Sequence, residues 1–217
     1  MNKKSIIIVE NHPIFRKGLE AIIEGEKDLE VVAATGNFEK ALALVDELAP
    51  DLVLVDLILN DANGIELIKI IKDKHPKIFL MVVTAHDDFI YVERSLKFGA
   101  NGYLLKDDSS EFLIPAIRTI FSGDIYLNEQ LKSKVIQKLI SNKPTETFSV
   151  DVLSDRELEV FRLLGNGRTV DDISEALGIS KKTVETYRAR IKEKLKIKKS
   201  AELLQEAFRW VQSKSVK

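Results

Sequence analysis

Short apolar runs alternate with longer amphipathic segments through the front half of the chain. Unbroken apolar runs are typical of parallel strands that are covered on both faces. The predicted strands are Ser5–Val9, Leu29–Ala34, Leu52–Val55, Ile78–Val83 and Gly102–Leu105. After the first strand, Phe15, Leu19 and Ile22 follow helical spacing, and Pro13 suits the start of that helix. We therefore expect strands and helices in alternation.

Four more helices are expected between and after the later strands, at Phe38–Leu48, Gly64–Lys74, Asp87–Phe98 and Ser110–Ser122. Asp108 or Ser110 can cap the last of these helices. Pro115 lies just past its first turn, where we expect it to distort the helix. Five strands alternating with five helices predict a doubly wound α/β domain with a parallel sheet.

The pattern changes after Gly123. Leu131–Ile140 has the composition of a short helix, but the residues that follow it, from Ser141 to Ser149, are polar and rich in helix breakers. Such a segment is typical of a linker. The sequence thus predicts a first domain over residues 1–123, a linker over 124–149 and a second domain over 150–217.

The last part of the chain carries only helix signals. Ser154 and Glu157 form a capping box before one apolar run. Gly178-Ile179-Ser180 predicts a tight turn between a second helix and a basic third one, Lys181–Lys196. A fourth helix is expected over Ser200–Val211. Two short helices joined by a tight turn containing Gly predict an all-α, four-helix domain of the helix-turn-helix type.

Charge separates the two predicted domains. The whole chain has 33 Lys and Arg against 34 Asp and Glu. Residues 1–150 contain 18 basic and 23 acidic residues, whereas residues 151–217 contain 15 and 11, and residues 178–199 contain nine and two. A locally basic helical domain indicates a polyanion such as nucleic acid as its partner.

The composition also limits where the protein works. The chain has no cysteine, which excludes a disulfide scaffold and thiolate metal sites and is typical of the reducing cytoplasm. Its apolar start is too short for a signal peptide or a membrane span and fits a first buried strand. We therefore expect a cytoplasmic protein with no membrane partner.

The residues just beyond the predicted strands carry the candidate chemistry. These residues are Glu10, Asn11, His12, Asp56, Thr84 and Lys106. Parallel strands bring their carboxyl ends to one edge of the sheet, where α/β folds bind ligands. A carboxylate such as Asp56 can attack phosphorus, while a divalent cation, an ammonium group and a hydroxyl group stabilise the phosphoryl oxygens. Alone, Thr84 can cap a helix and Lys106 can pair with an acid, but together the set indicates a phosphoacceptor site.

Four stretches of the first domain carry a family resemblance: IIIVENHPIFRKGL, the strand ending in Asp56, VVTAHDD, and GANGYLLKDDSSEFLIPAIRTIFSGDIYL. There the chain resembles the receiver domains of two-component response regulators, over nearly all of residues 4–127. The resemblance implies a flavodoxin-like (βα)5 fold in which a sensor histidine kinase phosphorylates Asp56.

The same resemblance assigns roles to the other residues of the set. It implies Mg²⁺ bound by Glu10, Asn11, Asp56 and the backbone carbonyl of Ile58. It implies that Thr84, Lys106 and Tyr103 respond to the phosphoryl group. It also implies that the domain is not an enzyme, with self-dephosphorylation as its only reaction beyond accepting the phosphoryl group.

Two positions depart from the usual receiver pattern. Asn11 stands where the family usually has a second acid, normally a direct metal ligand. Its amide oxygen brings no charge, so we expect weaker Mg²⁺ binding and hence slower or absent phosphorylation. Asn60 stands where proline is common, which we expect to affect loop stiffness only. His12 matches the family's usual His-Pro pair and is expected to be structural rather than a catalytic base.

The basic third helix of the tail has an apolar stripe and a polar face. The stripe consists of Val184, Tyr187, Ile191 and Leu195. Small and polar residues at the start of such a helix suit base edges in the major groove, and flanking basic residues suit phosphates. A solvated helix face is the alternative interpretation, which the tight turn and the concentration of basic residues make weaker.

The order LSDRELEVFRLLGNGRTVDDISEALGISKKTVETYRARIKEKL resembles the LuxR-type DNA-binding domain, over about residues 150–212. Joined to a receiver, it indicates the NarL/FixJ subclass of response regulators. The candidate DNA contacts are Lys182, Thr183, Glu185, Thr186 and Arg190. The resemblance also implies a homodimer on promoter half-sites, and RNA polymerase is a further candidate partner. Leu203, Leu204 and Phe208 are candidates for the dimer contact, with a role in the core as the alternative.

We therefore expect a transcription regulator that is switched by phosphorylation of Asp56. The nearest alternative is a phosphorylation-independent regulator, which Asn11 would favour. An aspartyl-phosphate phosphatase would usually need a second acid two residues after the nucleophile, and that position is Ile58. A flavodoxin-like electron carrier would need a phosphate-binding loop after the first strand, which Asn11-His12-Pro13 does not resemble.

Overall fold

The computed structural model describes residues 3–59, 63–86, 89–141 and 150–215. The chain divides into two compact units, Met1–Asn142 and Lys143–Lys217. Each unit has its own buried core, and each is described by itself.

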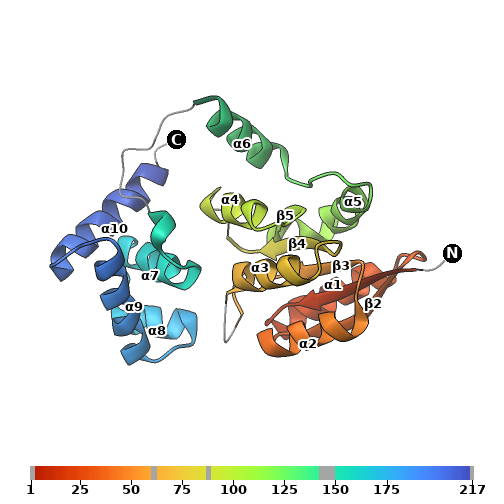
Figure 1. Ribbon diagram of the computed structural model, residues 1–217, viewed down its shortest axis with the longest axis horizontal. Helices are drawn as coiled ribbons and strands as arrows, with labels where there is room; N and C mark the ends of the chain where they lie inside the picture. Colours follow the sequence, from red (N-terminus) through yellow and green to blue (C-terminus); the bar gives the residue numbers. More distant parts are fainter. Residues whose placement is uncertain (1–2, 60–62, 87–88, 142–149, 216–217) are drawn as a thin grey trace. The chain divides into compact units, whose positions relative to one another are not determined.

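A five-stranded parallel sheet lies at the centre of the first unit (Figure 1). Its strands are β1 (Lys4–Val9), β2 (Leu29–Thr35), β3 (Leu52–Val55), β4 (Phe79–Thr84) and β5 (Gly102–Leu105). Their order across the sheet is β2-β1-β3-β4-β5. All five predicted strands are present, and every residue of β3 is buried, as its unbroken apolar run requires.

Helices cover both faces of this sheet (Figure 1). They are α1 (Pro13–Glu24), α2 (Phe38–Leu48), α3 (Gly64–Lys74), α4 (Phe89–Lys97) and α5 (Ser109–Phe121). Leu19 of α1 and Leu113 of α5 share one core layer with strand residues such as Ile6. On the other face, α3 contacts both α2 and α4. The predicted doubly wound α/β fold is confirmed.

The helix starts follow local chemistry. Pro13 occupies the first turn of α1, where its missing N–H costs nothing. Asn37 and Asn63 cap α2 and α3, because their Oδ1 atoms accept from Lys40 N (2.8 Å) and Ile65 N (2.7 Å). Helix α5 runs through Pro115 without interruption, and Asp108 precedes it without a side-chain cap. The predicted helix start at Asp87 and the departure at Asn60 lie outside the described residues.

The segment after α5 packs against the first unit. Tyr126 forms a bridge beside β5, where its N–H donates to Asn101 O (3.0 Å) and its carbonyl accepts from Tyr103 N (2.9 Å). Leu127 and Leu131 are buried, and α6 (Glu129–Ser141) contacts α4. The predicted short helix is therefore confirmed, while the division at residues 123 and 149 stays a prediction.

The second unit consists of helices. After the short 3-10 turn η2 (Val150–Val152) come α7 (Asp155–Gly165), α8 (Val170–Leu177), α9 (Lys181–Lys194) and α10 (Ser200–Ser215). The predicted capping box at Ser154 and Glu157 is present, and a second one joins Thr169 to Asp172. Gly178 takes a left-handed conformation (φ 63°) in the turn before α9, which a residue without a Cβ adopts at little cost.

The core of this unit is small and apolar. Its buried side chains include Phe161, Ile173, Val184, Ile191, Leu203 and Trp210. The ring centroids of Phe161 and Trp210 are 5.9 Å apart. Helix α9 thus buries the stripe predicted from its sequence, apart from the half-buried Tyr187. Among the residues that the structure describes, no helix is both long and apolar enough to cross a membrane.

Candidate functional site

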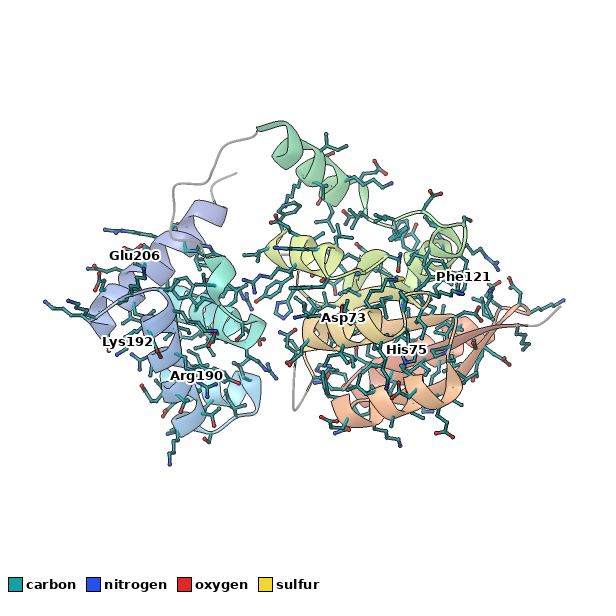
Figure 2. All side chains as sticks on the ribbon, viewed as in Figure 1. Asp73, His75, Phe121, Arg190, Lys192 and Glu206 are labelled. Carbon is teal, nitrogen blue, oxygen red and sulfur yellow. The ribbon has the colours of Figure 1, made fainter. Side chains whose placement is uncertain are left out.

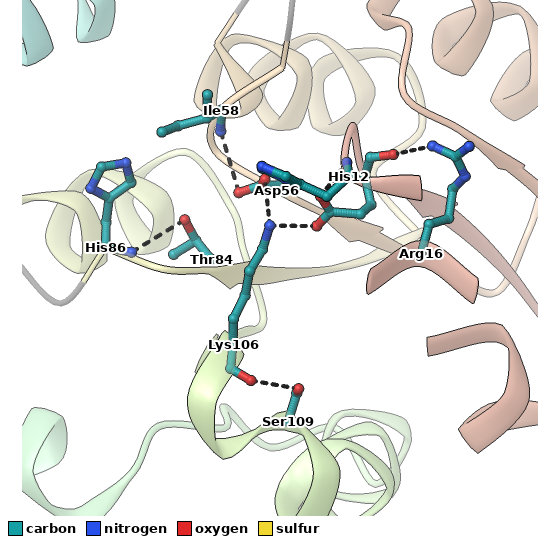
Figure 3. Close-up of polar contacts among 9 residues, drawn as sticks. His12, Arg16, Asp56, Ile58, Thr84, His86, Lys106 and Ser109 are labelled. Carbon is teal, nitrogen blue, oxygen red and sulfur yellow. Dashed lines mark hydrogen bonds and ion pairs between the residues drawn. The ribbon is translucent and has the colours of Figure 1, made fainter. Parts of the chain in front are cut away.

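Two carboxylates lie close together at the carboxyl edge of the sheet, and Figure 3 labels one of them, Asp56. Glu10 follows β1 and Asp56 follows β3, and these two strands are neighbours. Only 1% of Glu10 and 3% of Asp56 is exposed. The sheet order reverses direction next to β1, so this edge is the topological switch point where doubly wound folds bind ligands.

Lys106, just after β5, reaches back across the sheet to both acids (Figure 3). Its Nζ atom lies 2.7 Å from Glu10 Oε2 and 2.8 Å from Asp56 Oδ2. The same atom lies 4.8 Å from the centroid of the Phe15 ring. Two buried carboxylates repel each other, so a cation between them is what keeps both in one site.

The surroundings of Asp56 disfavour its ionised form. Burial raises the pKa of the Asp56 carboxyl group, and the neighbouring charge of Glu10 raises it further. Lys106 and the N–H of Ile58, which is 3.3 Å from Asp56 Oδ1, oppose that rise. A buried carboxylate whose pKa is perturbed by burial and by a neighbouring charge has the features of a nucleophile.

The residues around Glu10 hold it in place. Its Oε1 atom accepts from the N–H of His12 (2.8 Å) and lies 2.9 Å from His12 Nδ1. Arg16 donates from Nη1 to the carbonyl of Glu10 (2.6 Å). Sequence reasoning gave no role to Arg16 and treated Phe15 only as a helix core residue. Neither role has a local signal, because both depend on how α1 packs beside β1.

The candidate cation ligands lie in this cluster. Glu10, His12 and Asp56 each offer a ligand atom, and these atoms all lie within 4.8 Å of one another. Asn11 is half-buried beside them, and Ile58 contacts Asp56 through its N–H. Two carboxylates so close together suit a hard divalent cation. The donor set therefore fits Mg²⁺, with one carboxylate fewer than the usual receiver pattern.

Two of the three predicted switch residues, Thr84 and Tyr103, both bond to the backbone of His86. Thr84 is fully buried at the end of β4, and its Oγ1 atom accepts from His86 N at 3.4 Å. Tyr103 is buried in β5, and its hydroxyl donates to the carbonyl of His86 (2.7 Å). The backbone of Tyr103 also bonds to Tyr126. The residue predicted to respond to phosphorylation is thus tied both to the loop after Thr84 and to the segment that leads into α6.

The predicted DNA contacts lie on one helix, α9. The exposed members are Lys182, Glu185, Thr186 and Arg190 (Arg190 is labelled in Figure 2), and Thr183 is half-buried. The Thr183 hydroxyl contacts Ser180 Oγ at 2.8 Å, and Thr186 donates to the carbonyl of Lys182 (2.9 Å). Glu185 accepts from Arg188 Nη1 at 2.6 Å. Lys182 and Arg190 therefore present charge to solvent, while the two threonines also bond within the helix start.

The three residues predicted for the dimer contact on α10 differ in their exposure to solvent. Leu203 is fully buried, so the alternative of a core role holds for this residue. Leu204 and Phe208 are 42% and 55% exposed. They line a cavity of about 400 Å³ together with Arg168 and Arg188. Only Leu204 and Phe208 remain candidates for a contact with a second copy.

Comparison with known families assigns the carboxylate cluster and helix α9 to two known domain types. Residues 6–118 match the response regulator receiver domain. The chain is a response regulator. Residues 151–207 match the bacterial regulatory proteins of the luxR family, which makes this response regulator a DNA-binding transcription regulator.

Relatives share both domains of this response regulator. The chain is 31% identical over 226 residues to the transcriptional regulatory protein DegU of Brevibacillus brevis, covering 97% of this chain and 96% of the relative. It is 33% identical over 209 residues to the oxygen regulatory protein NreC of Staphylococcus aureus, covering 94% and 96%. A solved structure of the Salmonella typhimurium RcsB response regulator aligns with a TM-score of 0.59 at 25% identity, covering 94% of this chain and 98% of that one.

Proposed function

We propose that this response regulator accepts a phosphoryl group on Asp56 from a sensor histidine kinase and thereby controls its binding to promoter DNA. The observation that carries the proposal is the buried pair of Glu10 and Asp56 with Lys106 between them. An oxygen of Asp56 attacks phosphorus, forming an O–P bond while the N–P bond of phosphohistidine breaks and the imidazole leaves.

The chain's own residues would serve this transfer in distinct ways. Lys106 can move from the carboxylate of Asp56 to a phosphoryl oxygen, because its contacts are ion pairs and hydrogen bonds. Thr84 can donate its hydroxyl to another phosphoryl oxygen. Glu10, Asp56, Asn11 and the carbonyl of Ile58 would hold Mg²⁺, which neutralises charge developing on the phosphoryl group. Since Asn11 supplies no charge, the ion binds more weakly than at a site with three acids.

The switch and the output would be coupled through Tyr103. If Thr84 turns toward the phosphoryl group, it leaves the N–H of His86, and the hydroxyl of Tyr103 can then lose its bond to the His86 carbonyl. The energy for such a population shift comes from contacts that the phosphoryl group makes in only one state. DNA is bound by α9, with Lys182 and Arg190 at phosphates and Glu185 at base edges. A regulator that binds the chromosome in this way works in the cytoplasm.

Intact-mass measurement after incubation with acetyl phosphate and Mg²⁺ tests the phosphoacceptor role. We expect one added phosphoryl group on the wild type, none on Asp56→Asn, and faster labelling of Asn11→Asp. Asp51→Asn is the matched control, because Asp51 is an acid of the same sheet that pairs with Lys4 at the other edge. A wild type that stays unlabelled while Asn11→Asp is labelled would favour the phosphorylation-independent alternative.

DNA binding and pairing are tested by gel shift on promoter fragments. Homodimers are expected to prefer half-sites about one helical turn, or about 10 bp, apart. Leu204→Ser with Phe208→Ser is expected to remove that preference while single-site binding remains, because both side chains are exposed. Equal binding at every spacing by the wild type would contradict the dimer.

A further inference from the structure

The cluster at the carboxyl edge of the sheet contains one donor that the proposed Mg²⁺ site does not use. His12 brings its imidazole to within 4.8 Å of ligand atoms of both Glu10 and Asp56. Two carboxylates and one imidazole form a mixed oxygen and nitrogen set, which suits transition-metal dications better than the all-oxygen set that Mg²⁺ prefers.

Lys106 does not block this set. Its Nζ atom contacts Oε2 of Glu10 and Oδ2 of Asp56. The other oxygens of the two acids, Oε1 and Oδ1, instead face the N–H groups of His12 and Ile58 (Figure 3). Each carboxylate oxygen has two lone-pair sites. A cation bound through Oε1 and Oδ1 therefore lies on the His12 side of the cluster, while Lys106 keeps its ion pairs.

The His12 side chain is free to turn toward such a cation. It precedes α1 but makes no side-chain cap for the helix. Its side chain is 65% exposed, and its Nδ1 atom lies 2.9 Å from Glu10 Oε1. A rotation of the exposed ring exchanges that contact for a metal bond without disturbing the core.

The amide at Asn11 makes an imidazole ligand more important for cation binding at this site. A usual receiver would place a carboxylate at this position, and that charge would favour a hard cation regardless of the imidazole. Here the amide of Asn11 leaves two carboxylates, so a nitrogen ligand contributes a larger share of the binding energy.

We propose that His12 is a ligand of the divalent cation of this site, and that the site consequently prefers Mn²⁺ to Mg²⁺. The proposal deepens the proposed function and rests on it for the biological role of the ion. Binding itself is independent of phosphoryl transfer and can be measured without a phosphodonor.

The test uses the full chain freed of metal and titrated separately with Mn²⁺ and Mg²⁺ by calorimetry. Pulsed electron paramagnetic resonance on the Mn²⁺ sample adds a readout of nitrogen ligands. We expect Mn²⁺ to bind at least about tenfold more tightly than Mg²⁺, with a ¹⁴N coupling typical of imidazole.

Three variants separate the outcomes. His12→Ala is expected to abolish the ¹⁴N coupling and to weaken Mn²⁺ by about tenfold or more, because even partners outside the coordination shell contribute about 10–100-fold. His75→Ala is the matched control, since His75 pairs with Asp46 (2.7 Å) in the same unit (Figure 2). Asn11→Asp is expected to strengthen Mg²⁺ binding and so to reduce the preference of the site for Mn²⁺ over Mg²⁺.

The inference is overturned if the wild type shows no ¹⁴N coupling or if the coupling survives in His12→Ala. It is also overturned if the wild type binds Mn²⁺ and Mg²⁺ with equal affinity, or if it binds no Mn²⁺. If Mn²⁺ binds through His12 but acetyl phosphate labels nothing, the proposed function fails and this inference stands. If acetyl phosphate labels Asp56 in the presence of Mg²⁺ but the Mn²⁺ sample shows no ¹⁴N coupling, the proposed function stands and this inference fails.

Discussion

The two functional regions of this response regulator are built in opposite ways. The receiver site joins Glu10, Asp56 and Lys106, which follow three different strands, and the two acids are almost entirely buried. The DNA-binding surface takes its candidate residues from the first turns of one helix, α9, and most of them are exposed. Buried chemistry depends on long-range packing, whereas an exposed helix face depends on caps and periodicity.

The difference has an electrostatic side as well. Burial and Glu10 raise the pKa of the Asp56 carboxyl group, so ionising this acid costs stability. In the second unit, burial alone would raise the pKa of Glu157, but bonds from Lys194 and Ser154 hold it below its usual value. One unit therefore contains a buried acid whose ionisation lowers stability, and the other contains a buried acid whose ionisation supports it. Four changes sharpen this contrast.

The largest effect is expected from Gly64→Ala. A Cβ there would lie 2.1 Å from the carbonyl oxygen of Asp56 and 2.8 Å from Leu57 Cα, so backbone must move. We expect a loss of about 3 kcal/mol in the stability of the receiver, from overpacking against backbone. Hydrogen exchange of β3 peptides measures it. Gly18→Ala is the control, because nothing lies within 4 Å of its Cβ and it should instead gain about 0.5–1 kcal/mol. Equal protection in both variants would contradict the close approach.

Glu157→Gln should lower the stability of the second unit at pH 7 by about 1.5–3 kcal/mol, because it removes a charge-assisted bond to Lys194 (2.6 Å). The folded-state pKa of Glu157 is lowered, so its contribution to stability is present above its ordinary value of 4.5 and is lost as pH falls through the folded pKa. Urea unfolding followed by the fluorescence of Trp210, which is the single tryptophan, reports this unit. A deficit that persists unchanged at pH 3 would refute the ion pair.

Asp56→Asn should show the opposite pH dependence in the receiver. The folded-state pKa of Asp56 is raised above 3.8, so the wild type is favoured below that value and loses stability as pH rises through the folded pKa. As pH rises, the stability of the variant relative to wild type should therefore increase by about 1.4 kcal/mol for each pH unit between the unfolded-state and folded-state pKa values of Asp56. Hydrogen exchange of β4 peptides between pH 4 and 7 measures the gain. A constant difference across that range would contradict it.

The smallest effect is expected on the exposed helix. Lys182→Ala should weaken DNA binding by a similar factor on every sequence and reduce the slope of log K against log salt by about 1. Fluorescence anisotropy at several salt concentrations measures both quantities. Lys27→Ala is the control, since Lys27 is an exposed lysine of the receiver. An unchanged slope for Lys182→Ala would exclude a phosphate contact at this residue.

Local pattern alone could predict the elements that these changes probe. Apolar runs predicted all five strands, and the Ser154 and Glu157 pair predicted the start of α7. Asp56 could be selected because an acid at the end of a buried run is a strong local signal. Helix α5 continues through Pro115, and the distortion expected there stays a prediction.

The partners of the site residues were beyond local pattern. No spacing rule says that Lys106 bonds to Asp56, 50 residues away, or that Arg16 holds the carbonyl of Glu10. On α10, Leu203 and Leu204 are adjacent and equally apolar, yet one is buried and the other exposed. A change of one position turns a helical side chain by about 100°, so only the direction of the helix against α7 decides between them.

The sequence by itself determined the strands, the helix caps, the acid at the end of β3 and the basic character of α9, because periodicity, capping and charge act between residues that are near each other in the chain. Only the tertiary structure decided that Lys106 joins Glu10 and Asp56, that Tyr103 points to His86, and that His12 lies beside both acids. Those contacts are short-range in space but long-range in sequence, so they exist only once the sheet has brought its carboxyl ends to one edge.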